Sequence, residues 1–236
     1  LYWYHFEVTT DLGFHVISRA EGHNYAVEQE NMNPWQQNVY TNRFTIMCEG
    51  VKDAEDAMRW DGLEVQYGAG YAQRATMTRV EGNGGTWIYS AHITVDGMEG
   101  QTIPYRLGYY GQALTFDDPA DNTAGTVKLW SQSDEESFTC AVWGDNQQGL
   151  RANYHGWDSD IFLYVTKMFE HAVSRDVDFG IATGDMSSNG NYGTEIRPCI
   201  LDSTDAIFGR TLPYYVAWGN HDTSHPENKP YFETGA

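Results

Sequence analysis

The chain has 236 residues, 41% of them hydrophobic and 14% aromatic, which is enough apolar material for one large or two modest folded domains. Its 33 Asp and Glu outnumber its 14 Lys and Arg, the formal net charge is −19, and no basic run occurs. This charge excludes nucleic acid and anionic membrane surfaces as main partners, since both are bound through clustered positive charge.

The sequence favours a location outside the cell. Strong acidity is typical of proteins that stay soluble in salty or extracellular surroundings. No apolar stretch approaches the length of a membrane span, and the first residue is Leu1 rather than Met, as expected after removal of a leader. We therefore expect a secreted or cell-surface protein.

Residues 1–40 begin with alternating apolar and polar side chains. Tyr2, Tyr4, Phe6 and Val8 alternate with polar neighbours, which is the period of a half-buried strand. We expect this segment to form extra strands or an arm. Such an arm offers its sheet edge to a neighbouring chain, which gives a route to a homo-oligomer.

Residues 41–135 repeat the same period between Gly-rich turns, and helical periodicity is largely missing. The segments that we predict as strands are Arg43–Cys48, Leu63–Tyr67, Trp87–Val95 and Pro104–Tyr110. Asn83-Gly84-Gly85 and Asp96-Gly97 supply tight turns. The pattern predicts an antiparallel β-sandwich of the fibronectin type III sort.

Residues 136–236 have a different pattern, which follows a polar, acidic stretch over 131–137. Three apolar runs, over 138–143, 179–183 and 213–218, read as strands. A helix is predicted from Asp158 or Ser159, with an apolar stripe of Ile161, Val165, Met168, Phe169 and Ala172. This βαβαβ order predicts a second, α/β domain with a parallel sheet, so the chain as a whole is expected to have two domains.

Each of the three predicted parallel strands ends in a Gly followed by a side chain that can bind a metal. These side chains are Asp145, Asp185 and Asn220. Because ligand crevices in open α/β sheets lie outside the carboxyl ends of the strands, we expect the three to meet. A Gly before each lets the backbone turn sharply and approach an ion closely.

The three strand ends together resemble the first three metal-binding motifs of calcineurin-like metallophosphoesterases. The matching segments are Gly144-Asp145-Asn146-Gln147, Gly184-Asp185 and Gly219-Asn220-His221-Asp222. The resemblance implies that Asp145 and Gln147 hold one divalent metal ion, Asp185 bridges two, and Asn220 holds the second. It also implies that His221 contacts phosphate or protonates the leaving oxygen, and Asp222 is expected to orient the His221 ring.

The implied cofactor is a pair of divalent ions, Mn, Mg, Fe or Zn. Gln147 stands where the family usually has His, and its amide oxygen favours Mn or Mg over Zn. The strands of residues 41–135 resemble the sandwich that precedes the catalytic domain of purple acid phosphatases.

Two functions follow from these observations. The first is metal-dependent hydrolysis of a phosphate mono- or diester, with a small phosphate ester as substrate. Since the family's later His ligands have no match after His221, this chain is expected to hold only the front half of such a catalytic domain. The alternative is a non-catalytic, self-assembling extracellular surface protein that reuses a truncated phosphoesterase scaffold.

Overall fold

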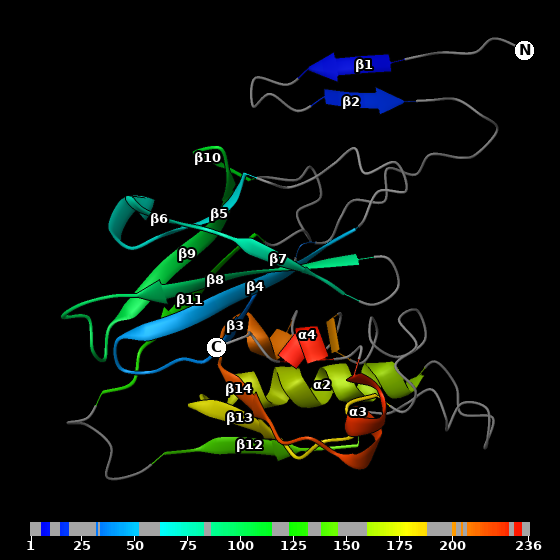
Figure 1. The fold of residues 1–236 in the computed structure, drawn as a ribbon. Helices are drawn as coiled ribbons and strands as arrows, with labels where there is room; N and C mark the ends of the chain where they lie inside the picture. The colour runs from blue at the N-terminus through cyan, green and yellow to red at the C-terminus, as the bar shows by residue number, and fades with distance from the viewer. Residues whose placement is uncertain are drawn as a thin grey trace, which may run out of the picture.

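The computed structural model describes residues 6–9, 15–18, 32, 34–51, 62–82, 86–114, 123–131, 138–145, 160–187, 200, 201, 204, 207–226 and 229–232 (Figure 1). This part of the chain is mostly antiparallel β-sheet with few helices. Its first element is a separate hairpin of β1 (Phe6–Thr9) and β2 (His15–Ser18). No helix in the described ranges has the length and apolar character needed to cross a membrane.

Two antiparallel sheets make up the middle of the chain (Figure 1). One has the order β3-β4-β8-β7, with bounds Trp35–Gln37, Arg43–Val51, Thr86–Thr94 and Thr78–Glu81. The other has the order β10-β9-β5-β6, with bounds Gln112–Ala113, Thr102–Tyr109, Leu63–Tyr67 and Gln73–Thr76, and β11 (Ala124–Lys128) also pairs with β9. A 3-10 turn, η1 (Ala69–Tyr71), joins β5 to β6. All four strands predicted for residues 41–135 are present.

Alternate residues of these strands fill the space between the two sheets. Phe44 and Ile46 of β4, Val65 of β5, and Tyr105 and Leu107 of β9 are all buried in one hydrophobic cluster. The period of two in the sequence therefore places one face of each sheet in a shared core. Trp35, Met47 and Ile88, on the other face of the first sheet, belong to a second cluster.

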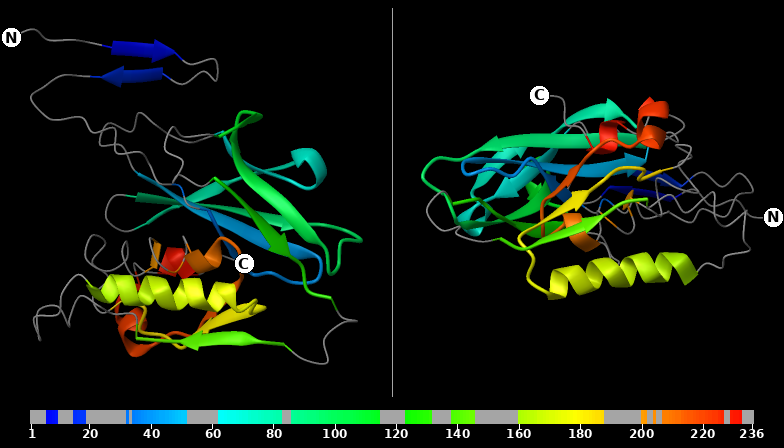
Figure 2. Two further views of the ribbon diagram at one scale, coloured as in Figure 1. Left: turned by 180° about the vertical axis from the view of Figure 1, so that it is seen from behind. Right: turned by 90° about the horizontal axis from the view of Figure 1, so that it is seen from below.

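A three-stranded parallel sheet contributes buried residues to the second cluster. This sheet has the order β12-β13-β14, with bounds Cys140–Trp143, Phe179–Ala182 and Tyr214–Val216. Helix α2 (Asp160–Ser174) joins β12 to β13 and packs beside the sheet (Figure 2). Two short helices, α3 (Asn220–Ser224) and α4 (Lys229–Phe232), follow β14.

The apolar face of α2 differs from the predicted stripe. Phe169 is buried, and Ala172 and Val173 pack against the same cluster. Met168 was expected in the stripe but is 44% exposed. The side chains three and four positions after Phe169 share its face, whereas Met168 points about a quarter turn away.

The parallel sheet has one buried and one open face. Trp143 of β12 is buried, with its ring centroid 5.0 Å from that of Phe169 and 5.2 Å from that of Phe208. The next residue back, Val142, points the other way and is 62% exposed. It aligns with Ile181 of β13, which aligns in turn with Tyr215 of β14. These side chains form an apolar row that is covered less than the opposite face.

Main-chain carbonyls tie the parallel sheet to the sandwich. The carbonyl oxygen of Arg210 accepts hydrogen bonds from Gln36 Nε2 at 3.2 Å and from the Tyr105 hydroxyl at 3.2 Å. The Tyr215 hydroxyl donates to the carbonyl oxygen of Val39 at 3.0 Å. These three donors at the junction thereby have acceptors, as burial requires.

Candidate functional site

The ends of β12 and β13 lie side by side. Trp143 aligns with Ala182 in the parallel ladder, and beyond that pair the Asp145 N–H donates to the Gly184 carbonyl oxygen at 3.0 Å. Just before that point, the Thr183 N–H donates to the Trp143 carbonyl oxygen at 2.7 Å. The backbone therefore carries Asp145 and Asp185 out of the same edge of the sheet, as the sequence predicted.

The ends of β13 and β14 approach each other still more closely. A Cβ atom on Gly184, which has φ +105°, would lie 2.7 Å from the Gly219 Cα. A Cβ atom on Gly219 would lie 2.5 Å from the Asp185 backbone nitrogen. Both glycines are therefore required by the close approach of two backbones, whereas the sequence predicted them for a sharp turn and the approach of an ion.

Asp145 and Asp185 share an unusual backbone conformation. Each follows the Gly that ends its strand, and each has a positive φ, 58° for Asp145 and 55° for Asp185. Asp tolerates this left-handed region better than most residues, at a cost of roughly 1–2 kcal/mol. Strain repeated at two equivalent strand ends is a mark of functional sites.

The third motif forms the start of helix α3, with Gly219 as its N-cap. The His221 N–H, in the first turn, donates to Asp185 Oδ1 at 3.0 Å. Asn220 is exposed, and its carbonyl oxygen accepts the hydroxyl protons of Thr223 and Ser224. Helix α3 thus brings the backbone of the third motif against the carboxylate of the second.

Asp222 has a role that the sequence interpretation did not foresee. Its side chain is fully buried, and its two carboxylate oxygens accept three backbone N–H groups, from Asp185 at 2.7 Å, Met186 at 3.0 Å and Gly219 at 2.9 Å. Its described contacts are thus with the main chain rather than with the ring of His221. An acidic residue three positions after an N-cap is half of a capping box, and that pattern was the available signal.

The side chains that reach the surface here carry oxygen atoms of the types that bind divalent cations. Asp145 is exposed and Asp185 is half-buried, and each has a carboxylate group; Asn220 is exposed and has an amide oxygen. Oxygen donors of this type favour hard ions such as Mg²⁺ and Mn²⁺. No group of three or more His, Cys, Asp or Glu is placed to hold a metal within the residues that the structure describes, and Gln147 lies outside them. The assignment of these side chains as metal ligands therefore stays a prediction.

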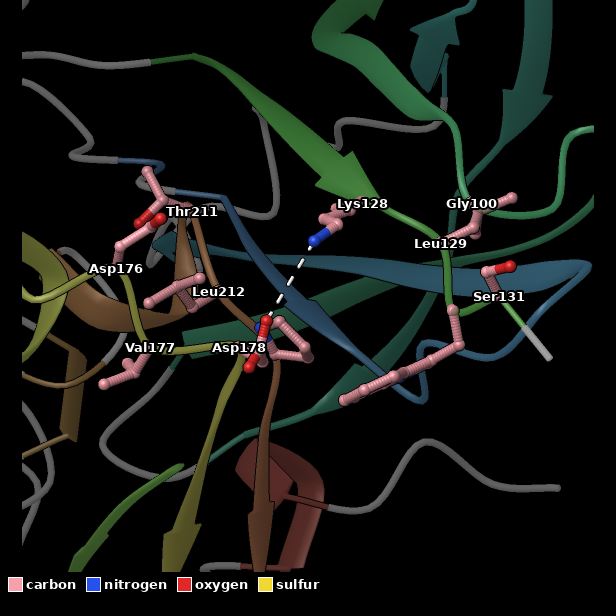
Figure 3. Close-up of a pocket in the computed structure, with 11 residues that line it drawn as sticks. Gly100, Lys128, Leu129, Ser131, Asp176, Val177, Asp178, Thr211 and Leu212 are labelled. Carbon is pink, nitrogen blue, oxygen red and sulfur yellow. Dashed lines mark ion pairs between the residues drawn. The ribbon is translucent and has the colours of Figure 1, made fainter. Parts of the chain in front are cut away.

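A pocket of about 130 Å³ lies elsewhere, at the amino ends of the parallel strands (Figure 3). Lys128 from the end of β11 faces Asp178, which precedes β13, with 4.0 Å between Nζ and Oδ1. None of the predicted site residues lines this pocket. It is smaller than ordinary small-molecule sites, and ligands of open α/β sheets bind at the opposite ends of the strands.

Comparison with known proteins gives likeness in structure alone. No family model matches the sequence, and no curated protein matches it. The chain is similar to the solved structure of purple acid phosphatase PPD1 from seeds of yellow lupin (Lupinus luteus), with a TM-score of 0.58 and 14% identity over 86% of this chain. It is also similar to the structure of PhoD, with a TM-score of 0.51 and 15% identity over 85% of this chain.

The chain covers 40% of that purple acid phosphatase chain and 41% of that PhoD chain, so it spans less than half of each. At such low identities the likeness concerns the fold. The described part of this chain resembles part of a phosphoesterase fold.

Proposed function

We propose that this chain forms part of a metal-dependent phosphoesterase, which hydrolyses a phosphate mono- or diester. One observation carries the proposal: the ends of three successive parallel strands, each a Gly followed by Asp, Asp or Asn, are joined by hydrogen bonds from backbone N–H groups. The bond from the His221 N–H to Asp185 Oδ1 and the bond from the Asp145 N–H to the Gly184 carbonyl oxygen make those contacts. The likeness in fold to a purple acid phosphatase and to PhoD supports the same reaction class.

In this proposal, Asp145, Gln147, Asp185 and Asn220 would hold two divalent cations, and Asp185 would be a ligand of both. Mn²⁺ or Mg²⁺ is favoured because every proposed ligand atom is an oxygen. When bound, such ions would supply positive charge for the phosphoryl oxygens and activate the attacking water. That charge matters here, because a chain with a net charge of −19 would otherwise repel an anionic substrate.

His221 is the proposed catalytic side chain of this chain. It lies in the first turn of α3, and its backbone N–H donates to the Asp185 carboxylate. The His221 side chain is therefore attached to the backbone close to the strand ends that carry the proposed metal ligands. From there it can donate a hydrogen bond to the phosphate or a proton to the leaving oxygen.

The remaining parts of the proposal concern the whole protein. We propose a fibronectin type III-like domain over residues 41–135, a catalytic domain that begins at 136, and secretion or display at the cell surface. Since this chain spans less than half of the similar structures, the other ligands would come from further polypeptide of the same fold. Parallel sheets usually have both faces covered. The exposure of Val142, 62% on the open face of this sheet, therefore fits a sheet that further polypeptide would cover.

Hydrolysis of p-nitrophenyl phosphate by the natural full-length protein with added Mn²⁺ tests this proposal. We expect a metal-dependent rate that falls by about 10²-fold or more in Asp185→Asn, because the variant loses a charged ligand. Asp178→Asn, the same substitution at the other end of β13, is the matched control and should keep the rate. A rate that is independent of metal, or unchanged in Asp185→Asn, would rule out the proposed reaction.

A further inference from the structure

The second and third motifs hold each other through reciprocal hydrogen bonds. The backbone of the third motif binds the side chain of the second, since the His221 N–H donates to Asp185 Oδ1 at 3.0 Å. The side chain of the third motif binds the backbone of the second, since the Asp222 carboxylate accepts the N–H groups of Asp185 and Met186. Asp185 is therefore fixed both at its backbone and at its carboxylate.

We propose that Asp222 is a positioning residue, which sets the backbone and carboxylate of Asp185 for cation binding; this inference rests on the proposed metal site. Asp222 acts through the main chain: it also binds the Gly219 N–H at 2.9 Å, so a single buried side chain fixes both strand ends. Ligands that are held by such outer contacts bind metal more tightly, and loss of the outer contact costs about 10–100-fold in affinity.

The chemistry of the three bonds requires a carboxylate. An ionised carboxyl group only accepts hydrogen bonds and has about four acceptor sites, which is enough for three N–H donors. An Asn side chain has the same shape but presents one oxygen and one NH₂ group. In Asp222→Asn at least one of the three backbone N–H groups would face another donor, inside a fully buried site.

The strained backbone of Asp185 explains why the hydrogen bonds of Asp222 affect the site. Asp185 has φ 55°, a conformation that few side chains adopt without support from their surroundings. Its own N–H makes the 2.7 Å bond to Asp222, the shortest of the three. Loss of that bond would let residues 185 and 186 relax and move the carboxylate away from its present place.

The test measures Mn²⁺ affinity by titration and amide hydrogen exchange at residues 185, 186 and 219, in wild type, Asp222→Asn and Asp222→Glu. In Asp222→Asn we expect faster exchange at these amides and an Mn²⁺ affinity about 10–100-fold weaker. Asp222→Glu keeps both acceptor oxygens, and we expect it to recover amide protection and affinity together. If Asp222→Asn does not fold, Asp222→Glu still tests the proposal through the same two measurements.

Asp178→Asn is the matched control, since Asp178 Oδ2 accepts the Thr139 N–H at 2.8 Å at the opposite end of the same sheet. It should leave Mn²⁺ affinity unchanged. A folded Asp222 variant that loses amide protection but binds Mn²⁺ like wild type would overturn the positioning role alone. A wild-type protein without any Mn²⁺ binding would overturn both this role and the proposed function.

Discussion

The β-sandwich and the parallel sheet use their residues in different ways. In the sandwich, alternate side chains of two sheets fill one closed core, and a turn glycine such as Gly97 has open space where a Cβ atom would lie. In the parallel sheet, one face is buried, the other exposes Val142, and the glycines at the strand ends touch neighbouring backbone. The sandwich is organised for stability, whereas the ends of the parallel strands are organised around polar side chains.

The largest expected effect distinguishes the two faces of the parallel sheet. Trp143→Ala should lower the free energy of unfolding by about 3–5 kcal/mol, because it removes a large buried ring that contacts Phe169 and Phe208. Val142→Ala, one residue away on the open face, should change it by about 0.5 kcal/mol or less. Urea denaturation of both variants measures the difference, and equal losses would mean that the open face is covered in solution.

A smaller effect is expected when a glycine at a strand end is compared with a glycine in a turn. Gly184→Ala should cost at least about 2 kcal/mol, since its φ of +105° is strained for Ala and the added Cβ would meet the Gly219 backbone. Gly97→Ala, with φ +67° and open space around it, should cost only about 1 kcal/mol. Thermal denaturation of the two variants compares them. A Gly184→Ala protein as stable as Gly97→Ala would contradict the close approach of the second and third strand ends.

The smallest effect concerns the sandwich core and depends on pH. Burial raises the pKa of the Tyr105 hydroxyl, which also donates to the Arg210 carbonyl oxygen at 3.2 Å. Because the unfolded chain ionises this tyrosine near pH 10 and the folded chain does so later, its contribution to stability is present below about pH 10 and lost as the pH rises. Tyr105→Phe should therefore cost about 1 kcal/mol near pH 7 and reduce the loss of stability above pH 10.

Unfolding measured at pH 7 and pH 10.5 checks this expectation. Tyr110→Phe is the control, because Tyr110 is 68% exposed and removal of its hydroxyl should change the free energy of unfolding little. The alkaline loss should be reduced rather than abolished in Tyr105→Phe, since burial also raises the pKa of Tyr67 and Tyr215. An alkaline loss identical to that of wild type would show that Tyr105 is solvated.

The sequence predicted the parts of the fold that depend on local pattern. Strand β5 begins and ends at the predicted residues, Leu63 and Tyr67, because its alternation is regular and a Gly stands at either side. The strands β3, β6, β7, β10 and β11 were not predicted, because each is short and has no more than two apolar side chains. Their pairing with distant strands decides their conformation.

The candidate site was predictable for a similar reason, and only in part. The order of three apolar runs, each ending in Gly and a polar residue, predicted that Asp145 and Asp185 emerge at one edge of a sheet. The bonds of Asp222 to the backbone of Asp185 and Met186 join segments 37 and 36 positions apart in the sequence, and no local pattern encodes them. Placement of Gln147 remains a prediction, because it lies outside the described residues.

Binding of Mn²⁺ to the natural full-length protein, measured by electron paramagnetic resonance of the free ion during a titration, tests the central claim most directly. We expect wild type to bind Mn²⁺, and Asp185→Asn to bind it at least about 10-fold more weakly, because the variant replaces the carboxylate that His221 holds at the meeting point of the strand ends. Equal binding by the two proteins, or none by wild type, would contradict a metal site at the carboxyl ends of the parallel strands.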